Sequence, residues 1–295
     1  IHPDQPEEKL GWFSLFESED NMDGVRAVLD AACAYLKEKG ATQVVGPIAP
    51  QYDLLNRGLL VDAFDGLPVL HNPYNKAYYP ALLEGYGFVK KRDYLAYQIP
   101  IADVPLEKME PLAQKVEQRF NFRVEQIPSQ RLGLRLAREI ASIIAKASKA
   151  TGEDVPTPED IQQLLERLKT IYRGELCVMA YAGEKPIGVV LAFPDNTPYL
   201  QALDGVETPL RVLKAVLSMK NVTTVRCPMQ SVVPEYQSKA VNLAMIHHAI
   251  SNAKRLGYTY IEGSTVPEDD VVSINNTLLA GGRHYRTYRV YTKDL

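Results

Sequence analysis

Two ten-residue stretches of this chain share four residues at the same spacing. Residues 37–46 read KEKGATQVVG and residues 254–263 read KRLGYTYIEG, with lysine, glycine, threonine and glycine in common. Each stretch follows apolar residues at helical spacing and leads into a strand-like run, so each predicts a helix that ends at a glycine. The order strand, long helix, glycine, strand, loop, short helix, glycine, long strand surrounds both. Similarity of this kind predicts a duplicated unit.

The alternative is that helix–glycine–strand joints look alike in all α/β proteins. The agreement in element order favours duplication, and alternating strands and helices predict a sheet with helices packed on it. The first copy lacks the helices and hairpin that precede the second. We therefore expect a partial unit over residues 1–97 and a complete one over residues 98–295.

The composition limits the class of protein. The chain has 295 residues, a net charge of −3 and no apolar run near the roughly 20 residues that cross a membrane. An acidic chain argues against a nucleic-acid surface, and the five scattered histidines lack the spacing of metal ligands. Three cysteines, Cys33, Cys177 and Cys227, lie in apolar runs and read as buried free thiols. We expect a cytoplasmic protein without nucleic-acid, membrane or metal partners.

Residues 232–242, VVPEYQSKAVN, carry a recognisable pattern at the predicted start of a helix. The segment resembles the diphosphate-binding loop of the GNAT (GCN5-related N-acetyltransferase) superfamily, V-x-P-E-[YF]-[RQ]-x-x-G-x-[GA]. The order of elements after Ile99 is also similar to that family. The resemblance implies a mixed, mostly antiparallel sheet flanked by helices, in a partial and a complete copy. It also implies acetyl-CoA or another acyl-CoA as co-substrate, held by backbone N–H groups at a helix N-terminus.

The sequence departs from the family pattern at its two glycine positions, which hold Ala240 and Asn242. Asparagine is the larger change and would crowd the phosphates. The residues that the resemblance predicts for binding the acyl donor are Met229, Ser231, Val232, Val233, Gln237, Ser238, Lys239, Ala240, Val241 and Asn275. The equivalent stretch of the first copy, residues 15–23, is acidic and would repel a diphosphate. We expect the first copy to bind no donor.

Catalysis in this family is direct attack by an amine on the thioester. The tyrosine that often protonates the leaving thiolate is replaced by Thr277. Tyr285 and Tyr288 are possible substitutes, although tyrosines on a strand more often pack in a core. Glu262 is the candidate base, on a strand face shared with Tyr260 and Ser264; a salt bridge at the rim of the sheet explains it almost as well.

The loop from His71 to Tyr79 is rich in polar and aromatic groups and either lines an acceptor pocket or packs as surface. The leading hypothesis is transfer of an acyl group, expected to be acetyl, from acyl-CoA to a small-molecule or peptide amine. One alternative is a GNAT-fold protein that binds a ligand or partner without catalysis, which the changes at Ala240, Asn242 and Thr277 favour. Another is a Fem-like aminoacyl transferase, which would need a basic channel.

Overall fold

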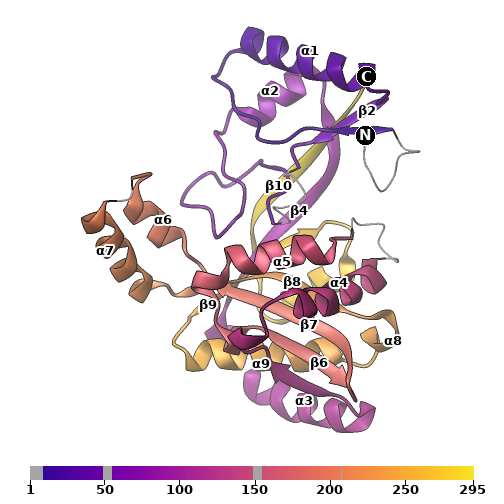
Figure 1. Ribbon diagram of the computed structural model, residues 1–295, viewed down its shortest axis with the longest axis vertical. Helices are drawn as coiled ribbons and strands as arrows, with labels where there is room; N and C mark the ends of the chain where they lie inside the picture. The colour runs from indigo at the N-terminus through magenta and orange to yellow at the C-terminus, as the bar shows by residue number, and fades with distance from the viewer. Residues whose placement is uncertain (1–8, 49–54, 149–154, 207) are drawn as a thin grey trace. The chain divides into compact units, whose positions relative to one another are not determined.

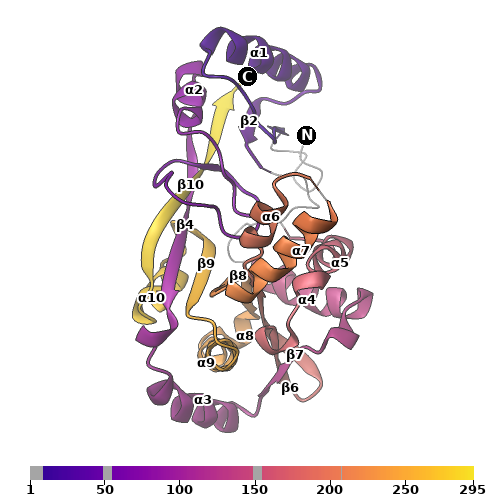
Figure 2. The same cartoon turned by 90° about the vertical axis from the view of Figure 1, so that its left-hand side faces the viewer.

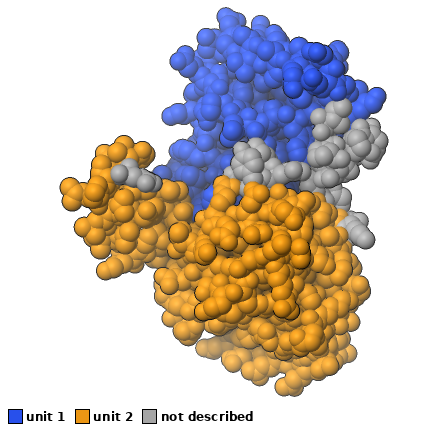
Figure 3. Space-filling view, in the orientation of Figure 1, with its two compact units in different colours: residues 1–97, 264–276, 284–295 blue, residues 98–263, 277–283 orange. Residues whose placement is uncertain are grey.

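The computed structural model describes residues 9–48, 55–148, 155–206 and 208–295. The chain divides into two compact units (Figure 3). Unit 1 comprises residues 1–97, 264–276 and 284–295, and unit 2 comprises residues 98–263 and 277–283.

The elements of unit 1 come from both ends of the chain (Figure 1). They are β1 (Leu10–Trp12), α1 (Met22–Glu38), β2 (Gln43–Gly46), β3 (Leu59–Leu60), α2 (Tyr79–Tyr86), β4 (Val89–Pro100), most of α10 (Val271–Leu279) and β10 (Arg283–Asp294). Its core includes Val25 and Leu29 of α1, Leu83 of α2 and Tyr291 of β10.

Unit 2 holds a second set of strands and most of the helices. Its elements are α3 (Leu106–Phe120), β5 (Arg123–Gln126), α4 (Leu134–Ser148), α5 (Pro158–Arg167), β6 (Val178–Ala182), β7 (Lys185–Pro194), α6 (Thr197–Leu203), α7 (Pro209–Ser218), β8 (Thr224–Val232), α8 (Pro234–Gln237), α9 (Val241–Arg255) and the first half of β9 (Tyr260–Pro267). Helices α9 and α3 lie on one side of its strands, and α4 and α5 lie on the other (Figure 2).

Among the described residues, the strands form a mixed sheet of ten strands that is mostly antiparallel, as expected. In unit 2 the order is β9-β8-β7-β6-β5, with β8 and β9 parallel and the other pairs antiparallel. In unit 1 the order is β1-β2-β10-β4, with β3 against β10. Strands β1 and β2 are parallel and are joined by α1, just as β8 and β9 are joined by α9.

The predicted repeat is reproduced in the geometry of its helix ends. Gly40 follows α1 with φ 90°, and Gly257 follows α9 with φ 89°. Both are left-handed positions that suit glycine. The Gly40 N–H donates to the Lys37 carbonyl oxygen, and the Gly257 N–H donates to the Lys254 carbonyl oxygen. The two copies also agree at the end of their short helices. Helices α2 and α10 are each followed by a glycine of positive φ and then by a strand of 12 residues.

The long final strands are exchanged between the two copies. Strand β10 ends the second copy, yet it pairs antiparallel with β2 of the first, from Tyr291 opposite Gly46 to Asp294 opposite Gln43. Strand β4 ends the first copy and neighbours β9 of the second. The compact units are divided after Tyr97, and residues 264–276 and 284–295 group with the N-terminal residues.

The structure also differs from the expected elements at several places. The strand expected over residues 10–16 ends at Trp12, and β3, β5 and α6 were not expected. The helix expected over residues 131–149 begins at Leu134, and Lys149 lies outside the described residues. The helix expected over residues 237–256 is α9, which begins only at Val241; Gln237 ends the short helix α8, and Ala240 between the two helices adopts a left-handed conformation. Among the residues that the structure describes, no helix is both long enough and apolar enough to cross a membrane.

Candidate functional site

Strand β8 contains a bulge near its middle. Leu191 of β7 lies opposite Met229, and Phe193 lies opposite Arg226, so β8 has one more residue than β7 between these pairs. Pro228 occupies this bulge and has no N–H to donate to a neighbouring strand. Bulges of this kind bend a strand and interrupt its pairing.

Strand β8 also loses its parallel neighbour at the bulge. The β8–β9 pairing runs from Thr224 opposite Tyr260 to Cys227 opposite Gly263, whereas β8 continues to Val232. Within the described chain, the second half of β8 therefore pairs with β7 on one edge and lies beyond the β9 pairing on the other.

Two backbone N–H groups are directed toward that second edge. The Val233 N–H donates to the Ile187 carbonyl oxygen at 2.9 Å, which fixes the side of the strand that faces β7. N–H groups alternate in direction along a strand. Those of Gln230 and Val232 consequently point away from β7, where a carbonyl oxygen of a bound molecule could accept from them.

The chain then turns directly into the N-terminus of α9. Ala240 precedes this helix with φ 55° and ψ 24°, and no side chain among the described residues caps the helix start. The first N–H groups of any α-helix lack partners within the helix and carry its positive end. The Gln237 side chain bonds back to the end of β8, since its Nε2 donates to the Val232 carbonyl oxygen at 3.1 Å.

Two side chains at this helix start are notable. The Lys239 ammonium lies 4.0 Å from the centre of the Tyr236 ring, which keeps a cation near the loop. The Asn242 Oδ1 is buried and has no hydrogen-bond partner among the described residues. An unsatisfied buried acceptor is uncommon in folded proteins.

A buried ion pair lies one residue before the end of the β8–β9 pairing. The Arg226 and Glu262 side chains are opposite each other in the parallel register, with 3.7 Å between Nε and Oε2. Their side chains are 0% and 1% exposed. Burial raises the pKa of the neighbouring Cys227 thiol to about 12, and the Glu262 carboxylate adds to the rise.

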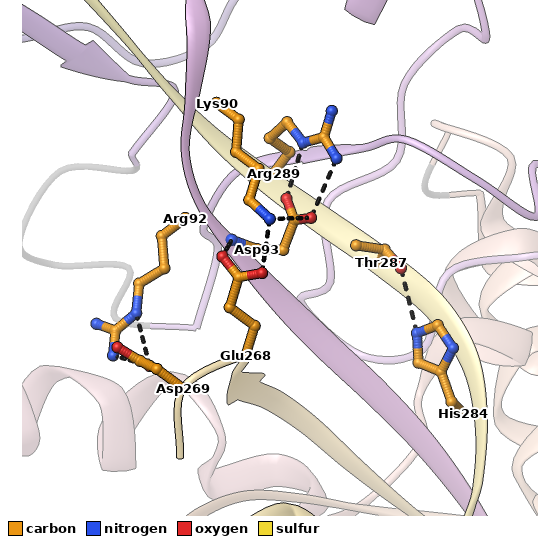
Figure 4. Close-up of polar contacts among 8 residues, drawn as sticks. All are labelled: Lys90, Arg92, Asp93, Glu268, Asp269, His284, Thr287 and Arg289. Atoms are coloured by element: carbon orange, nitrogen blue, oxygen red, sulfur yellow. Dashed lines mark hydrogen bonds and ion pairs between the residues drawn. The ribbon is translucent and has the colours of Figure 1, made fainter. Parts of the chain in front are cut away.

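Unit 1 has its own polar cluster, centred on the buried Asp93 of β4 (Figure 4). Arg289 of β10 binds both carboxylate oxygens, at 2.8 and 3.0 Å, and the Lys90 ammonium lies 3.0 Å from Oδ2. The Asp93 N–H donates to Glu268 Oε1. Burial opposes the charge on Asp93, but Arg289 and Lys90 together hold its pKa below the ordinary value. These contacts join β4, β10 and the residues after β9.

Two further contacts in Figure 4 lie beside this cluster. Arg92 pairs with Asp269, and the His284 Nε2 lies 3.2 Å from the Thr287 hydroxyl oxygen. The same His284 nitrogen is 2.9 Å from the Arg286 carbonyl oxygen, so it acts as a donor there. Both contacts therefore serve the local packing of β4 and β10.

Two curated proteins are similar to the whole chain, and no family model matches it. Protein YghO of Escherichia coli strain K12 is 24% identical over 305 residues, which cover 100% of this chain and 77% of that protein. A protein named bacterial ceramide synthase, from Caulobacter vibrioides, is 27% identical over 307 residues, which cover 100% of this chain and 78% of that protein.

Two solved structures of GCN5-related acetyltransferases have a similar fold. A GCN5-related N-acetyltransferase from Sphaerobacter thermophilus gives a TM-score of 0.54 at 14% identity, covering 93% of this chain and 69% of that one. The GCN5-related glucosamine N-acetyltransferase region of a fungal β-N-acetylglucosaminidase also gives 0.54, at 12% identity, covering 90% of this chain and 27% of that one. The chain has a GNAT fold.

Within this GNAT fold, the residues predicted to bind the donor fall into two groups. Nine of them lie in the continuous segment of β8, α8 and the start of α9: Met229, Ser231, Val232, Val233, Gln237, Ser238, Lys239, Ala240 and Val241. Asn275 is exposed on α10, in the part of that helix that belongs to unit 1. The left-handed conformation of Ala240 explains why the GNAT pattern favours glycine at this position.

The three predicted catalytic residues occupy different surroundings. Glu262 is in unit 2 and faces Arg226 inside the sheet, so its salt bridge is buried and does not lie at the rim. Tyr288 is fully buried in the core of unit 1 beside Leu60 and Val290, and Tyr285 packs against the same core. The catalytic roles of all three stay predictions.

The two copies of the repeat differ at the start of the helix that joins their two parallel strands. Asn21 caps α1 with its own side chain, which accepts from the Asp23 N–H at 3.0 Å. Helix α9 has no such cap in the described chain. A capped, acidic helix start has less capacity to bind a phosphate.

The sequence did not reveal the bulge in β8, the outward N–H of Gln230 or the partner of Glu262. Pro228 was the available signal, because proline inside a strand pattern marks an edge or a bulge. Arg226 carried no signal, since its burial depends on the pairing of β8 with β9.

The polar loop from His71 to Tyr79 makes several contacts within unit 1. Asn75 bonds both backbone groups of Leu60, at 2.8 and 3.1 Å, and Asn72 accepts from the Ser264 hydroxyl at 3.1 Å. These bonds account for packing of the loop, and a role in acceptor binding stays a prediction.

Proposed function

We propose that this chain is an acyltransferase that moves an acyl group from an acyl-CoA thioester to an amine and so forms an amide. The observation that supports it best is the succession of two features along one segment. Strand β8 turns two N–H groups away from β7 beyond the end of the β9 pairing, and a few residues later α9 begins without a cap from any described side chain. A thioester carbonyl and a diphosphate need these two kinds of donor.

The start of α9 is the proposed diphosphate site. The N–H groups of Val241, Asn242 and Leu243 lie in its first turn, where the positive end of the helix favours an anion. Lys239 adds a cation beside them. The small side chain of Ala240 obstructs the backbone little, although glycine would obstruct it less.

The outward N–H groups of β8 are the proposed donors to the thioester carbonyl. Donors that are fixed in a strand need no reorganisation when negative charge develops on that oxygen, which is the condition for effective stabilisation. We assign this role to Gln230 or Val232, because the N–H groups of both point to the edge of β8 that faces away from β7.

Direct attack by the amine fits the cysteines of unit 2. An acyl-cysteine intermediate would need a thiolate, but burial raises the pKa of both Cys177 and Cys227 to about 12. Each thiol is then almost wholly protonated at neutral pH and a poor nucleophile. The amine must lose a proton during attack, and we leave the group that accepts it unassigned between Glu262 and water.

The acceptor that we propose is a long-chain amine. The relative from Caulobacter vibrioides is named for ceramide synthesis, and a ceramide is a lipid in which a fatty acyl chain is amide-linked to a long-chain amine. Formation of such an amide from an acyl-CoA is the reaction proposed above for the N–H groups of β8 and the start of α9. The sequence predicted an acetyl group, so acetyl-CoA is compared with CoA esters of longer acyl chains.

The test combines turnover with binding. The protein is incubated with sphinganine and with acetyl-, octanoyl- or palmitoyl-CoA, while release of the CoA thiol and formation of the amide are followed by absorbance and mass spectrometry. We expect amide to form with at least one donor. If no CoA ester raises the melting temperature at concentrations about 100-fold above a micromolar Kd, the proposal of a CoA enzyme is wrong.

Stabilisation by CoA esters without any turnover would instead support the ligand-binding alternative. The changes at Ala240, Asn242 and Thr277 relative to the GNAT pattern are the observations that favour it.

A further inference from the structure

The connection between β7 and β8 is much longer than these strands require. They are antiparallel neighbours, which a two-residue turn can join, yet residues 195–223 separate them. Helices α6 and α7 occupy this connection and pack on each other (Figure 1). The sheet does not need this helical hairpin for its pairing, so the residues that the hairpin exposes call for an explanation of their own.

Helix α7 and the turn before it expose a row of large apolar side chains. Val206 lies before α7, and Leu210, Leu213 and Leu217 follow one another at intervals of three and four residues, which places these three leucines on one face of the helix. They are 51%, 81%, 57% and 49% exposed. We call these four residues the α7 apolar row. An exposed row of this kind is a usual sign of an interaction surface.

The charged residues of α7 and of the turn that follows it are basic. Residues 208–221 contain Arg211, Lys214 and Lys220 and no acidic residue, in a chain whose net charge is −3. Lys214 follows Leu210 by four residues and so lies beside the row. Asp204 pairs with Arg211 at 3.3 Å, whereas Lys214 and Lys220 form no ion pair with any of the residues that the structure describes. Glu207, which precedes the helix, lies outside the described residues.

We propose that α7 binds the surface of a bilayer that contains anionic phospholipid. The α7 apolar row would enter the boundary between headgroups and acyl chains, and Lys214 and Lys220 would face the lipid phosphates. Leucines on one side and lysines at its edge are the pattern of helices that lie in a membrane interface without crossing it. The expectation of no membrane partner came from the lack of a spanning segment, which does not bear on a helix of this kind.

Helix α10 shows why charge decides between candidate surfaces. It also exposes large apolar residues, Val272 and Leu279, but its sequence VVSINNTLL carries no charge. It offers no attraction to an anionic surface. A second copy of the chain is a weaker candidate for α7, because the lysines of two copies would repel each other across an interface formed by the same face.

The test is binding of the 295-residue chain to vesicles without any CoA ester. Two kinds are used: phosphatidylcholine alone, and phosphatidylcholine with about one third phosphatidylglycerol. We expect co-sedimentation with the second kind, weakened about tenfold or more by Leu213→Glu, which places a carboxylate in the apolar row. Leu112→Glu is the matched control, since Leu112 is a leucine of similar exposure, 50%, on α3 of the same unit. It should bind as the unchanged chain does.

The charge is tested by the double variant Lys214→Glu/Lys220→Glu, which should bind anionic vesicles at least about tenfold more weakly while its melting temperature stays within a few degrees of the original. Equal losses for Leu213→Glu and Leu112→Glu would overturn the proposal, as would equal binding to both kinds of vesicle. If no vesicles are bound and Leu213→Glu abolishes a dimer seen by sedimentation velocity, the row is a self-association surface and the proposal is wrong. None of these outcomes depends on acyl transfer.

Discussion

Arg226 of β8 and Glu262 of β9 form an ion pair that is closed off from solvent, with 3.7 Å between Nε and Oε2. The pair lies one residue before the end of the pairing between these two parallel strands. Burying two charges has a high desolvation cost, and removal of one partner leaves the other uncompensated. The pair therefore makes Glu262 a residue on which the fold depends, whatever its part in catalysis.

Replacing Glu262 with glutamine should lower the free energy of unfolding by about 3–5 kcal/mol, because Arg226 loses its counter-ion inside the sheet. Urea denaturation measures the change. The double variant Arg226→Met/Glu262→Met should regain most of the loss, since no buried charge remains. If Glu262→Gln unfolds at the same urea concentration as the original but loses turnover, the carboxylate is a catalytic base, as the sequence suggested.

Much of the fold could be predicted from local patterns in the sequence. The spacing of apolar residues predicted α3 over Leu106–Phe120 without error, and the glycines at 40 and 257 predicted the ends of α1 and α9. Those signals are local, because a helix and its cap are decided by neighbouring residues.

The exchange of the final strands could not be predicted in this way. The choice of β2 as the partner of β10 is made between residues about 250 positions apart, such as Asp294 and Gln43. The alternation of apolar residues in β10 suits either copy. The burial of Arg226 has the same origin, since nothing near it in the chain identifies Glu262 as its partner.

Replacing Ala240 with glycine should raise stability by up to about 1 kcal/mol. Alanine at φ 55° is strained, and glycine removes that strain at some cost in chain entropy. The matched control is Ala249→Gly within α9, where the same change should lower stability by about 1 kcal/mol or more. Urea denaturation of both variants tests the prediction, which fails if Ala240→Gly is the less stable of the two.

Replacing Ser238 with aspartate should weaken CoA binding by at least about tenfold, because its carboxylate would stand near the diphosphate proposed at the start of α9. Isothermal titration with CoA measures this. Ser251→Asp, near the other end of the same helix, is the control and should bind CoA as before. Unchanged affinity in Ser238→Asp would move the donor site away from this loop.

Arg289→Gln should lower the free energy of unfolding by about 2–4 kcal/mol at pH 7, because it removes both bonds to the buried Asp93 carboxylate. Burial alone would raise the pKa of Asp93, but Arg289 and Lys90 outweigh it and the pKa is lowered. Their stabilisation is therefore present above the ordinary aspartate pKa and is lost as the pH falls through the lowered value.

The difference between Arg289→Gln and the original chain should consequently shrink as the pH falls below about 4. Urea denaturation at pH 7, 5 and 3.5 follows it. Arg283→Gln serves as the control, because Arg283 pairs with Asp103 in an exposed position and should change stability by about 1 kcal/mol or less. A difference that is constant from pH 7 to pH 3.5 would show that Asp93 is not the group that Arg289 stabilises.

Cys227→Ala should leave the rate of acyl transfer within a few-fold of the original if the amine attacks the thioester directly. Burial raises the pKa of this thiol to about 12, so the fraction present as thiolate at pH 7 is on the order of one in 100,000. For the same reason, iodoacetamide at pH 8 should modify Cys227 far more slowly than it modifies the protein unfolded in urea. Mass spectrometry of the chain mixed with acyl-CoA alone should find no added acyl group. An acyl group on Cys227 before amine is added, together with loss of turnover in Cys227→Ala, would replace direct attack with a two-step transfer through this cysteine.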